Sequence, residues 1–483
     1  MAQTARMHRW APRPELRRWA ASAVVAVMGL AGGLSACGSG HRAAPGTRTA
    51  APVRTVPTPA PRLTGTHRCP PPTGAFACST LAVPLDRAAP AGARLRLAVA
   101  VERRRSPRGV LIALSGGPGQ PGLPFAARLR ARLGAAAAGY RIVTIDQRGT
   151  GANALQCPEL QRAAGSSDLT VPRRAAVTAC ARALGARRAF FTTADTVADL
   201  DDLRRALGVD RVTLDGVSYG TFVAERYALA HPREVARLVL DSVVPQDGVD
   251  ALYADALAAT SRVLRLVCRE QRCATDPVAD LRRVVRRRHD GPALLDTLVA
   301  LSIGRPRLSG VPAVLHAAAA GLPAALDRLV RQVHGAQRVP AAFLSQGLHA
   351  ATLCADLRAP WGGPDAPPAA REPALRRAAA RLAPGELGAF DRATASGNGI
   401  ASTCAAWPPI PRPALDPGGP LPRVPVLLLA GDHDLSTPLA WARRQRRRAP
   451  LGRLVVIPGA GHAVQSQTGN AQAARALTRF LTG

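Results

Sequence analysis

The sequence predicts an α/β fold with a mostly parallel central sheet, helices on both faces of that sheet and a helical insertion. Short β-type runs alternate with helical patterns from about residue 80 onward. Between about residues 245 and 420 this alternation is replaced by helical segments rich in Ala, Leu and Arg and interrupted by Pro and Gly. Two further strand-like runs follow, so we expect the last part of the chain to complete the sheet.

The composition is typical of a chain that buries a hydrophobic core. Of its 483 residues, 47% are hydrophobic and 20% are charged, which argues against intrinsic disorder and against a multi-span membrane protein. The formal charge of +32 comes from arginine alone, because the sequence contains no lysine. Arginines are scattered along every segment, whereas nucleic-acid binding favours clustered basic residues beside aromatic side chains. We therefore expect no nucleic-acid partner.

The first 36 residues are typical of a bacterial export signal. Five arginines precede an apolar stretch from 19 to 34, which is long enough for a signal but short and Gly-interrupted for a spanning helix. It ends in Leu34-Ser35-Ala36-Cys37, which resembles a lipobox whose cysteine is lipidated. An ordinary signal peptide with a chance cysteine is the alternative. We expect an extracytoplasmic protein, anchored to the cell membrane through Cys37 or secreted.

Residues 37–68 are expected to form an extended tether, because they are rich in Ala, Pro and Thr and lack apolar periodicity. Eight cysteines follow. An even number in an exported protein indicates disulfides, and pairing between neighbours is the favoured hypothesis among the many pairings that the sequence leaves open. None of the spacings is a zinc pattern, so no metal is expected. In chain order these cysteines are Cys69, Cys78, Cys157, Cys180, Cys268, Cys273, Cys354 and Cys404.

The predicted strands divide the folded part of the chain into three segments. A first core segment spans 69–244, the helical insertion spans 245–420, and a C-terminal core segment spans 421–483. A helix is predicted from Thr193 to Gly208, because Thr193 and Asp195 are typical of a helix start and Gly208 is typical of a helix end. A second helix is predicted from 221 to 230. The strands themselves are predicted at residues 95–101, 109–114, 140–145, 211–214, 235–240, 424–430 and 453–457.

The sequence Gly216-Val217-Ser218-Tyr219-Gly220 lies directly between a predicted strand and a predicted helix. A nucleophile elbow requires small residues two positions on either side of the serine, because a Cβ there would clash in so tight a turn. Both positions are glycine. We therefore predict Ser218 as a nucleophile.

A serine nucleophile needs a base, which an acid orients. After the insertion, one predicted strand runs into Asp432 and Asp434, and the last strand runs into His462. These residues follow the carboxyl ends of strands, where open α/β sheets bind ligands. We predict His462 as general base and then acid, and Asp434 as the orienting carboxylate. Asp432 and Asp241 are the alternative acids, and their ordinary roles would be to form a turn and to shape a loop.

Other polar positions complete this prediction. The Gly- and Pro-rich residues 115–122 follow an early strand and would supply one backbone donor to the oxyanion, with the N–H of Tyr219 as the other. A plain Gly/Pro turn is the alternative.

Five further histidines lie in helical or loop contexts where a surface or packing role is favoured: His231, His289, His316, His334 and His349.

With these motifs the chain resembles the prolyl iminopeptidases and tripeptidyl aminopeptidases of the α/β-hydrolase superfamily, exported actinobacterial-type members in particular. The resemblance extends from about residue 69 to the end of the chain. The residues that carry it are Gly116-Gly117-Pro118-Gly119 with Gly122, Asp146 to Gly151, Gly216 to Gly220, Leu238 to Asp241, Cys354-Ala355-Asp356, Cys404 to Pro408, Gly431 to Pro438 and Gly461-His462.

The resemblance implies an α/β-hydrolase fold in which residues 245–420 form a cap over the active site. It also implies a Ser218, Asp434 and His462 triad, an oxyanion hole from the backbone groups of Gly117 and Tyr219, and a peptide substrate with a free N-terminus. The C-terminal segment would be of the tripeptidyl aminopeptidase (TAP) type. An acid must then bind the substrate ammonium, and Asp356 is the candidate, with an ordinary surface acid as the alternative.

One position departs from the family pattern, because Ser115 stands where prolyl iminopeptidases usually carry His. This departure argues against strict prolyl specificity. The sequence predicts a serine aminopeptidase without metal or cofactor. An esterase on the same scaffold is the main alternative, since fold and triad do not choose between amide and ester substrates. A lipid-anchored solute-binding protein is the remote alternative.

Overall fold

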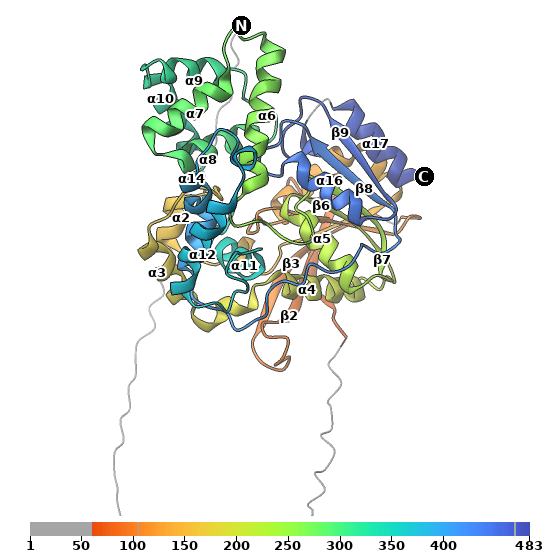
Figure 1. Ribbon diagram of the computed structural model, residues 1–483. Coiled ribbons are helices and arrows are strands. Elements are labelled where there is room, and N and C mark those ends of the chain that lie inside the picture. The colour runs from red at the N-terminus through yellow and green to blue at the C-terminus, as the bar shows by residue number, and fades with distance from the viewer. Residues whose placement is uncertain (1–59, 105, 468–469) are drawn as a thin grey trace, which may run out of the picture. The chain divides into compact units, whose positions relative to one another are not determined.

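The computed structural model describes residues 60–104, 106–467 and 470–483 (Figure 1). The predicted export signal, the lipidation site Cys37 and most of the predicted tether lie outside the described residues. Within the described ranges, no helix is long and apolar enough to cross a membrane.

The core is a nine-stranded sheet with the strand order β1-β2-β3-β5-β4-β6-β7-β8-β9. The first three strands pair antiparallel, β3 pairs antiparallel with β5, and every pair from β5 to β9 in this order is parallel. The strands are β1 (Leu63–Arg68), β2 (Phe76–Pro84), β3 (Arg94–Glu102), β4 (Val110–Leu114), β5 (Arg141–Ile145), β6 (Val212–Val217), β7 (Val235–Asp241), β8 (Val426–Gly431) and β9 (Gly452–Ile457). The predicted mostly parallel sheet is confirmed.

The end of the predicted tether is wrong, because residues 63–68 form strand β1. This strand lies at the edge of the sheet and pairs only with β2, and the hydroxyls of Thr66 and Ser79 are hydrogen-bonded at 2.8 Å. Its side chains are mostly exposed, so it lacks the hydrophobic alternation that marks a half-buried strand. It is a strand because its main chain is hydrogen-bonded to β2, although its sequence lacks the alternating pattern.

Alternate residues of the central strands point to two opposite helical layers. Leu111 and Leu427 belong to the apolar cluster that contains α1 (Ala126–Leu133) and α17 (Ala471–Thr482). Ile112 and Leu428 belong to the larger cluster on the other face. The helices packed on that face are α4 (Thr193–Ala206), which a capping box of Thr192 and Asp195 starts, α5 (Tyr219–Ala230) and α16 (Leu439–Arg448). Burial on both faces explains why these strands are continuous apolar runs.

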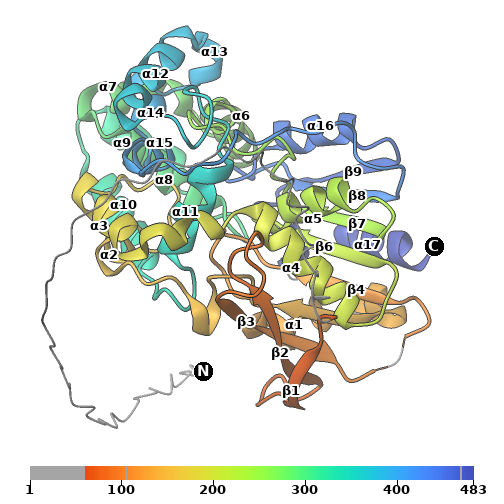
Figure 2. The ribbon, with the colours of Figure 1, turned by 90° about the horizontal axis from the view of Figure 1, so that it is seen from below.

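The insertion between β7 and β8 is helical, and none of the named strands lies in it. Helices α2 and α3, which come earlier in the chain, pack on its helices α11 and α15 (Figure 2). The helices of this region are α2 (Pro158–Ala164), α3 (Arg174–Leu184), α6 (Ala254–Gln271), α7 (Pro277–Arg288), α8 (Gly291–Ser302), α9 (Val311–Ala319), α10 (Ala324–Ala336), α11 (Gln346–Asp356), α12 (Pro368–Arg381), α13 (Pro384–Leu387), α14 (Arg392–Gly397) and α15 (Gly399–Ala406).

Four disulfides join the cysteines as neighbours along the chain, which is the pairing that the sequence favoured. Two of them fasten helices: one joins Cys157, the residue before α2, to α3, and another joins α11 to α15. The pairs are Cys69–Cys78, Cys157–Cys180, Cys268–Cys273 and Cys354–Cys404.

Candidate active site

Ser218 lies in a sharp turn between β6 and α5. Its backbone has φ 58° and ψ −127°, a conformation that is strained for a residue with a side chain. A Cβ on Gly216 would clash with the carbonyl of Gly220, and one on Gly220 would clash with the carbonyl of Leu114. Both glycines are therefore required, and the turn has the strand–turn–helix arrangement that the sequence predicts for an elbow.

His462 and Asp434 are in direct contact at the ends of neighbouring strands. The Nδ1 atom of His462 lies 2.9 Å from Oδ2 of Asp434, and Asp434 is fully buried. A carboxylate only accepts hydrogen bonds, so Nδ1 carries the proton and Nε2 of the neutral ring keeps a lone pair. This tautomer can accept a proton at Nε2, as a general base must.

The loop after β8 fixes the Asp434 carboxylate. Oδ1 accepts the backbone N–H groups of Ser436 and Thr437, both at 2.9 Å. The Thr437 hydroxyl donates to Oδ2 at 2.6 Å and lies 3.1 Å from Nδ1 of His462. Sequence reasoning missed Thr437, although its place three residues after an aspartate is the signal of a side chain that closes a local turn.

The electrostatic surroundings of His462 favour its charged form. Burial lowers the pKa of this imidazole, but the charges of Asp434, Asp241 and Asp168 and the hydrogen bond with Asp434 outweigh burial and raise the pKa above its usual value. An imidazole in this setting can hold a proton taken from a nucleophile.

The two alternative acids have other partners. Oδ1 of Asp432 accepts the N–H of Gly459 at 2.8 Å and lies 2.6 Å from Nδ1 of His433, so Asp432 forms a turn. Asp241 is fully buried, and its carboxylate accepts the N–H groups of Val464 and Gln465 at 3.0 and 2.8 Å. Asp241 therefore shapes the loop that follows the histidine.

Burial raises the pKa of Asp241 to about 6, although its backbone hydrogen bonds and the charges of His462 and Arg132 oppose this shift. The carbonyl oxygen of the same residue accepts the N–H of Ser218 at 2.9 Å. One aspartate thus connects the serine turn to the histidine loop, and it places both at one edge of the sheet.

Residues 115–122, hereafter the glycine loop, border the serine. A Cβ on Gly116 would lie 3.1 Å from Cβ of Ser218. Gly117 has φ 106°, which favours glycine, and a Cβ there would meet the backbone nitrogen of Gly119 at 2.6 Å. Tyr219 is the first residue of α5, where backbone N–H groups have no acceptor within the helix. Of the two predicted oxyanion donors, Gly117 follows Gly116, which lies against the serine, and Tyr219 directly follows the serine.

The segment after β5 supports the glycine loop from the core. Oδ1 of Asp146 accepts the N–H groups of Gly122 and Leu123 at 2.9 and 2.8 Å. The Gln147 side chain donates to the carbonyl of Ser115 at 3.2 Å. The Ser115 hydroxyl donates to the carbonyl of Gln120 at 2.7 Å. Ser115, which stands where prolyl iminopeptidases usually carry His, thus closes the loop.

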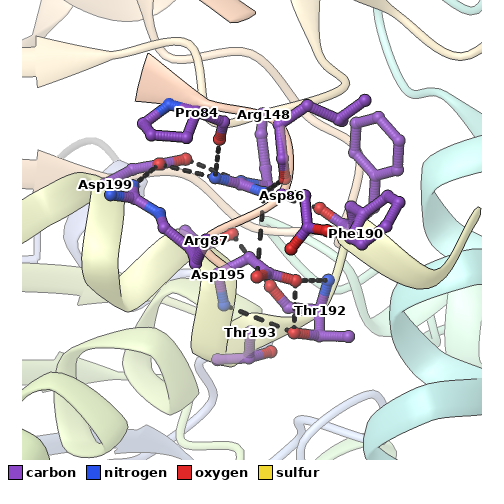
Figure 3. A network of polar contacts seen from close by, with 12 residues as sticks. Pro84, Asp86, Arg87, Arg148, Phe190, Thr192, Thr193, Asp195 and Asp199 are labelled. Atoms are coloured by element: carbon purple, nitrogen blue, oxygen red, sulfur yellow. Dashed lines mark hydrogen bonds and ion pairs between the residues drawn. The ribbon is translucent and has the colours of Figure 1, made fainter. Parts of the chain in front are cut away.

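Arg148 anchors this supporting segment in a buried polar network (Figure 3). Its fully buried guanidinium makes two hydrogen bonds of 2.7 Å with Asp199 of α4 and donates to the carbonyl of Phe190 at 2.6 Å. A bidentate arginine–carboxylate pair fixes the orientation of both groups. The network thereby holds the residues next to Asp146 against α4.

Asp356 is the last residue of α11 and contacts the first residue of α4. Its Oδ2 accepts the N–H of Thr193 at 2.9 Å, and the Thr193 hydroxyl is hydrogen-bonded to the Tyr219 hydroxyl at 2.7 Å. Burial raises the pKa of Asp356 to about 6, against the hydrogen bonds from Thr193 and the charge of Arg226. The residue as a whole is half-buried. The assignment of Asp356 to an ammonium site stays a prediction.

Sequence reasoning missed Asp168 and favoured an ordinary surface or packing role for His349. His349 of α11 is buried, with Nδ1 2.9 Å from the carbonyl oxygen of Pro118 and Nε2 3.1 Å from Oδ1 of Asp168. Asp168 belongs to the segment between α2 and α3. Neither residue belongs to a motif identified in the sequence, and tertiary packing brings these three distant positions together.

Two segments of the chain match models of known families. Residues 109–266 match the family described as alpha/beta hydrolase fold, and residues 390–483 match the family described as TAP-like protein. Together these segments include the serine turn, Asp434 and His462.

Three curated proteins are similar to parts of the chain. Tripeptidyl aminopeptidase of Streptomyces coelicolor is 35% identical over 188 residues, which cover 35% of this chain and 35% of that protein. Proline iminopeptidase of Xylella fastidiosa is 32% identical over 127 residues, 24% of this chain and 31% of that protein. Serine protease Hip1 of Mycobacterium tuberculosis is 29% identical over 189 residues, 35% of this chain and 36% of that protein.

The chain therefore spans about a third of the length of each of these relatives. The strand order of its sheet, the helices on both faces of the sheet and the two matched segments all indicate the same fold. The chain has the α/β-hydrolase fold, and its C-terminal segment is similar to the family described as TAP-like protein.

Proposed function

We propose that this protein is a serine aminopeptidase that removes single residues or short peptides from free N-termini through an acyl-enzyme. The observation that carries the proposal is the 2.9 Å contact between His462 Nδ1 and the buried carboxylate of Asp434, at the same sheet edge as the strained Ser218 turn. The similarity to proteins named tripeptidyl aminopeptidase, proline iminopeptidase and serine protease supports a peptide substrate.

In the proposed reaction, the Ser218 hydroxyl attacks the carbonyl carbon of the scissile amide and its proton passes to Nε2 of His462. The carbonyl oxygen becomes an oxyanion, which the N–H groups of Gly117 and Tyr219 stabilise. His462 then protonates the leaving amine as the C–N bond breaks. Water, deprotonated by the same histidine, hydrolyses the ester and releases the N-terminal fragment and free Ser218.

Recognition of a free N-terminus requires a carboxylate near the nucleophile. Asp356 is our candidate, because its carboxylate is linked through Thr193 to Tyr219, the residue after the serine. An ammonium at this position would lower the pKa of the carboxyl group by favouring its charged form. The carboxylate would in turn hold the substrate N-terminus at a fixed distance from the serine.

We also propose that the protein is exported and anchored to the membrane through Cys37. The four disulfides support an oxidising compartment, since such bonds are rare in reducing cytoplasm. Expression of the full chain with a clickable fatty acid, followed by membrane fractionation, tests this proposal. The wild type should be acylated and membrane-bound, and Cys37→Ala should be neither. Equal fractionation without acylation would contradict the anchor.

The activity is tested with matched substrates on the purified protein. Tripeptidyl and aminoacyl chromogenic amides with a free N-terminus, their N-acetylated forms and simple acyl esters are compared. We expect amide turnover that N-acetylation abolishes, and Asp356→Asn should raise KM for the free amides without affecting ester turnover. Ester turnover alone would instead favour the esterase.

A further inference from the structure

The first turn of α11 contacts the glycine loop at two successive carbonyl groups. The N–H of Ser345 donates to the carbonyl of Gly119 at 3.0 Å, and Nδ1 of His349 lies 2.9 Å from the carbonyl oxygen of Pro118. The contact is close, because a Cβ on Gly119 would lie 2.7 Å from the Ser345 carbonyl oxygen. The insertion therefore contacts the loop through Ser345 and His349, in addition to the support from Asp146.

The protonation state of His349 follows from its two partners. The Pro118 carbonyl can only accept, so Nδ1 must carry a proton. Nε2 lies 3.1 Å from the Asp168 carboxylate, which also only accepts. Burial lowers the pKa of this imidazole, but the charge of Asp168 and the bonds with Asp168 and Pro118 raise it above its usual value. Both nitrogens are best satisfied when the ring is an imidazolium.

The glycine loop depends on such external contacts. Glycines impose little conformational preference of their own, and Pro118 has no N–H, so its carbonyl is the only backbone polar group through which that residue can be held. Pro118 directly follows Gly117, the predicted oxyanion donor. Because the two residues are covalently joined, a displacement of Pro118 would also displace the Gly117 backbone.

We propose that His349 is a positioning residue for the oxyanion hole: it holds the Pro118 carbonyl and thereby the Gly117 amide, while Asp168 holds the imidazolium of His349. This inference rests on the proposed serine hydrolase function. It adds a residue of the insertion to the machinery that stabilises the transition state.

The test compares substitutions that keep or remove the donor. His349→Asn keeps an N–H group close to the position of Nδ1, and His349→Leu removes it. The matched control is His316→Leu, because His316 is also a histidine of the insertion paired with an acid, Asp280, at 3.0 Å, on a helix away from the glycine loop. Each protein is assayed for kcat, KM and the rate of fluorophosphonate labelling, whose tetrahedral adduct places an oxygen in the oxyanion hole.

We expect His349→Leu to lower kcat and the labelling rate by about 10- to 100-fold with little change in KM, because a misplaced donor weakens transition-state binding. His349→Asn should recover most of this loss, and His316→Leu should stay within about twofold of wild type. Equal losses in the Leu and Asn variants would overturn the proposal, as would a Leu variant that labels like the control. Failure of the wild type to label at all would refute the proposed function instead.

A spectroscopic measurement tests the role of Asp168. In wild type, the side-chain ¹⁵N shifts of His349 should show an imidazolium at pH 7. Asp168→Asn should shift them to those of a neutral ring protonated at Nδ1, and kcat should fall less than in His349→Leu, because the Nδ1 donor remains. Unchanged shifts in Asp168→Asn would contradict the pairing.

Discussion

The backbone N–H of Ser218 donates to the carbonyl oxygen of Asp241 at 2.9 Å. Because the Asp241 carboxylate also accepts the N–H groups of Val464 and Gln465, this residue fixes the distance between the serine turn and the loop that follows His462. The acid of the neighbouring strand therefore has an architectural role, and the acid that touches His462 is Asp434.

Asp241→Ala should separate these two loops. The buried N–H of Val464 and the partly buried N–H of Gln465 would lose their acceptor, so we expect a loss of about 1–3 kcal/mol in the free energy of unfolding. We also expect kcat to fall by about 10- to 100-fold, because Ser218 and His462 would no longer be held in register. Denaturant unfolding and amide turnover measure the two effects. An active variant with normal kcat would contradict the architectural role.

Asp434→Asn should lower kcat by about 10⁴-fold, because the amide would stabilise the wrong tautomer of His462. Asp432→Asn is the matched control, since this acid lies two residues away, forms a turn and makes no hydrogen bond to His462 among the described residues. We expect it to lower stability but to keep kcat within about threefold. Comparable losses in both variants would mean that the acid is wrongly assigned.

Glu225 of α5 should make stability depend on pH. It is fully buried, and neither carboxylate oxygen has a hydrogen-bond partner within the described part of the chain. Burial and the charge of Asp247 raise the pKa of Glu225 well above the usual value of 4.5, and the nearby arginines only partly oppose this. The folded state thus holds a proton that the unfolded state releases.

This contribution to stability is complete below pH 4.5 and is lost as the pH rises toward the pKa of the folded state, by up to about 1.4 kcal/mol per pH unit. Glu225→Gln should remove that slope and raise the melting temperature at pH 8 relative to wild type. Melting curves of both proteins between pH 4 and pH 9 would decide the matter. Parallel curves would show that Glu225 is not protonated in the folded state.

The disulfide between Cys354 and Cys404 should stabilise the helix that carries His349. It joins α11 to α15 and closes a loop of 50 residues. Replacing both cysteines with Ser should cost about 2–5 kcal/mol of unfolding free energy, and hydrogen exchange should increase first in α11. Unchanged exchange in α11 would show that packing alone holds this helix.

The parts of the fold with local signals were predictable from sequence. The central strands are uninterrupted apolar runs, and α4 has a clear start and stop, so their positions agree with the structure within a few residues. The serine turn was recognisable because its glycines are required locally. By contrast, β1 is an exposed edge strand, and α2 and α3 pack with an insertion that begins far later in the chain.

The same distinction separates the site residues. Asp434 and His462 follow strand ends and could be placed in chain order, and Asp434 could be preferred to Asp432 only as a hypothesis. His349 and Asp168 are brought to Pro118 by tertiary packing, and the sequence around them does not indicate this contact. Long-range contacts of this kind have no periodicity that a single sequence can show.

The most direct test of the central claim is to map the residue that a fluorophosphonate modifies. The purified protein and His462→Ala are labelled under identical conditions, digested and analysed by mass spectrometry. We predict a single modified peptide containing Ser218 in the wild type, and labelling at least about 100-fold slower in His462→Ala because the hydroxyl lacks its base. A modified residue other than Ser218, or equal labelling of the two proteins, would contradict the assignment of Ser218, Asp434 and His462 as the catalytic residues.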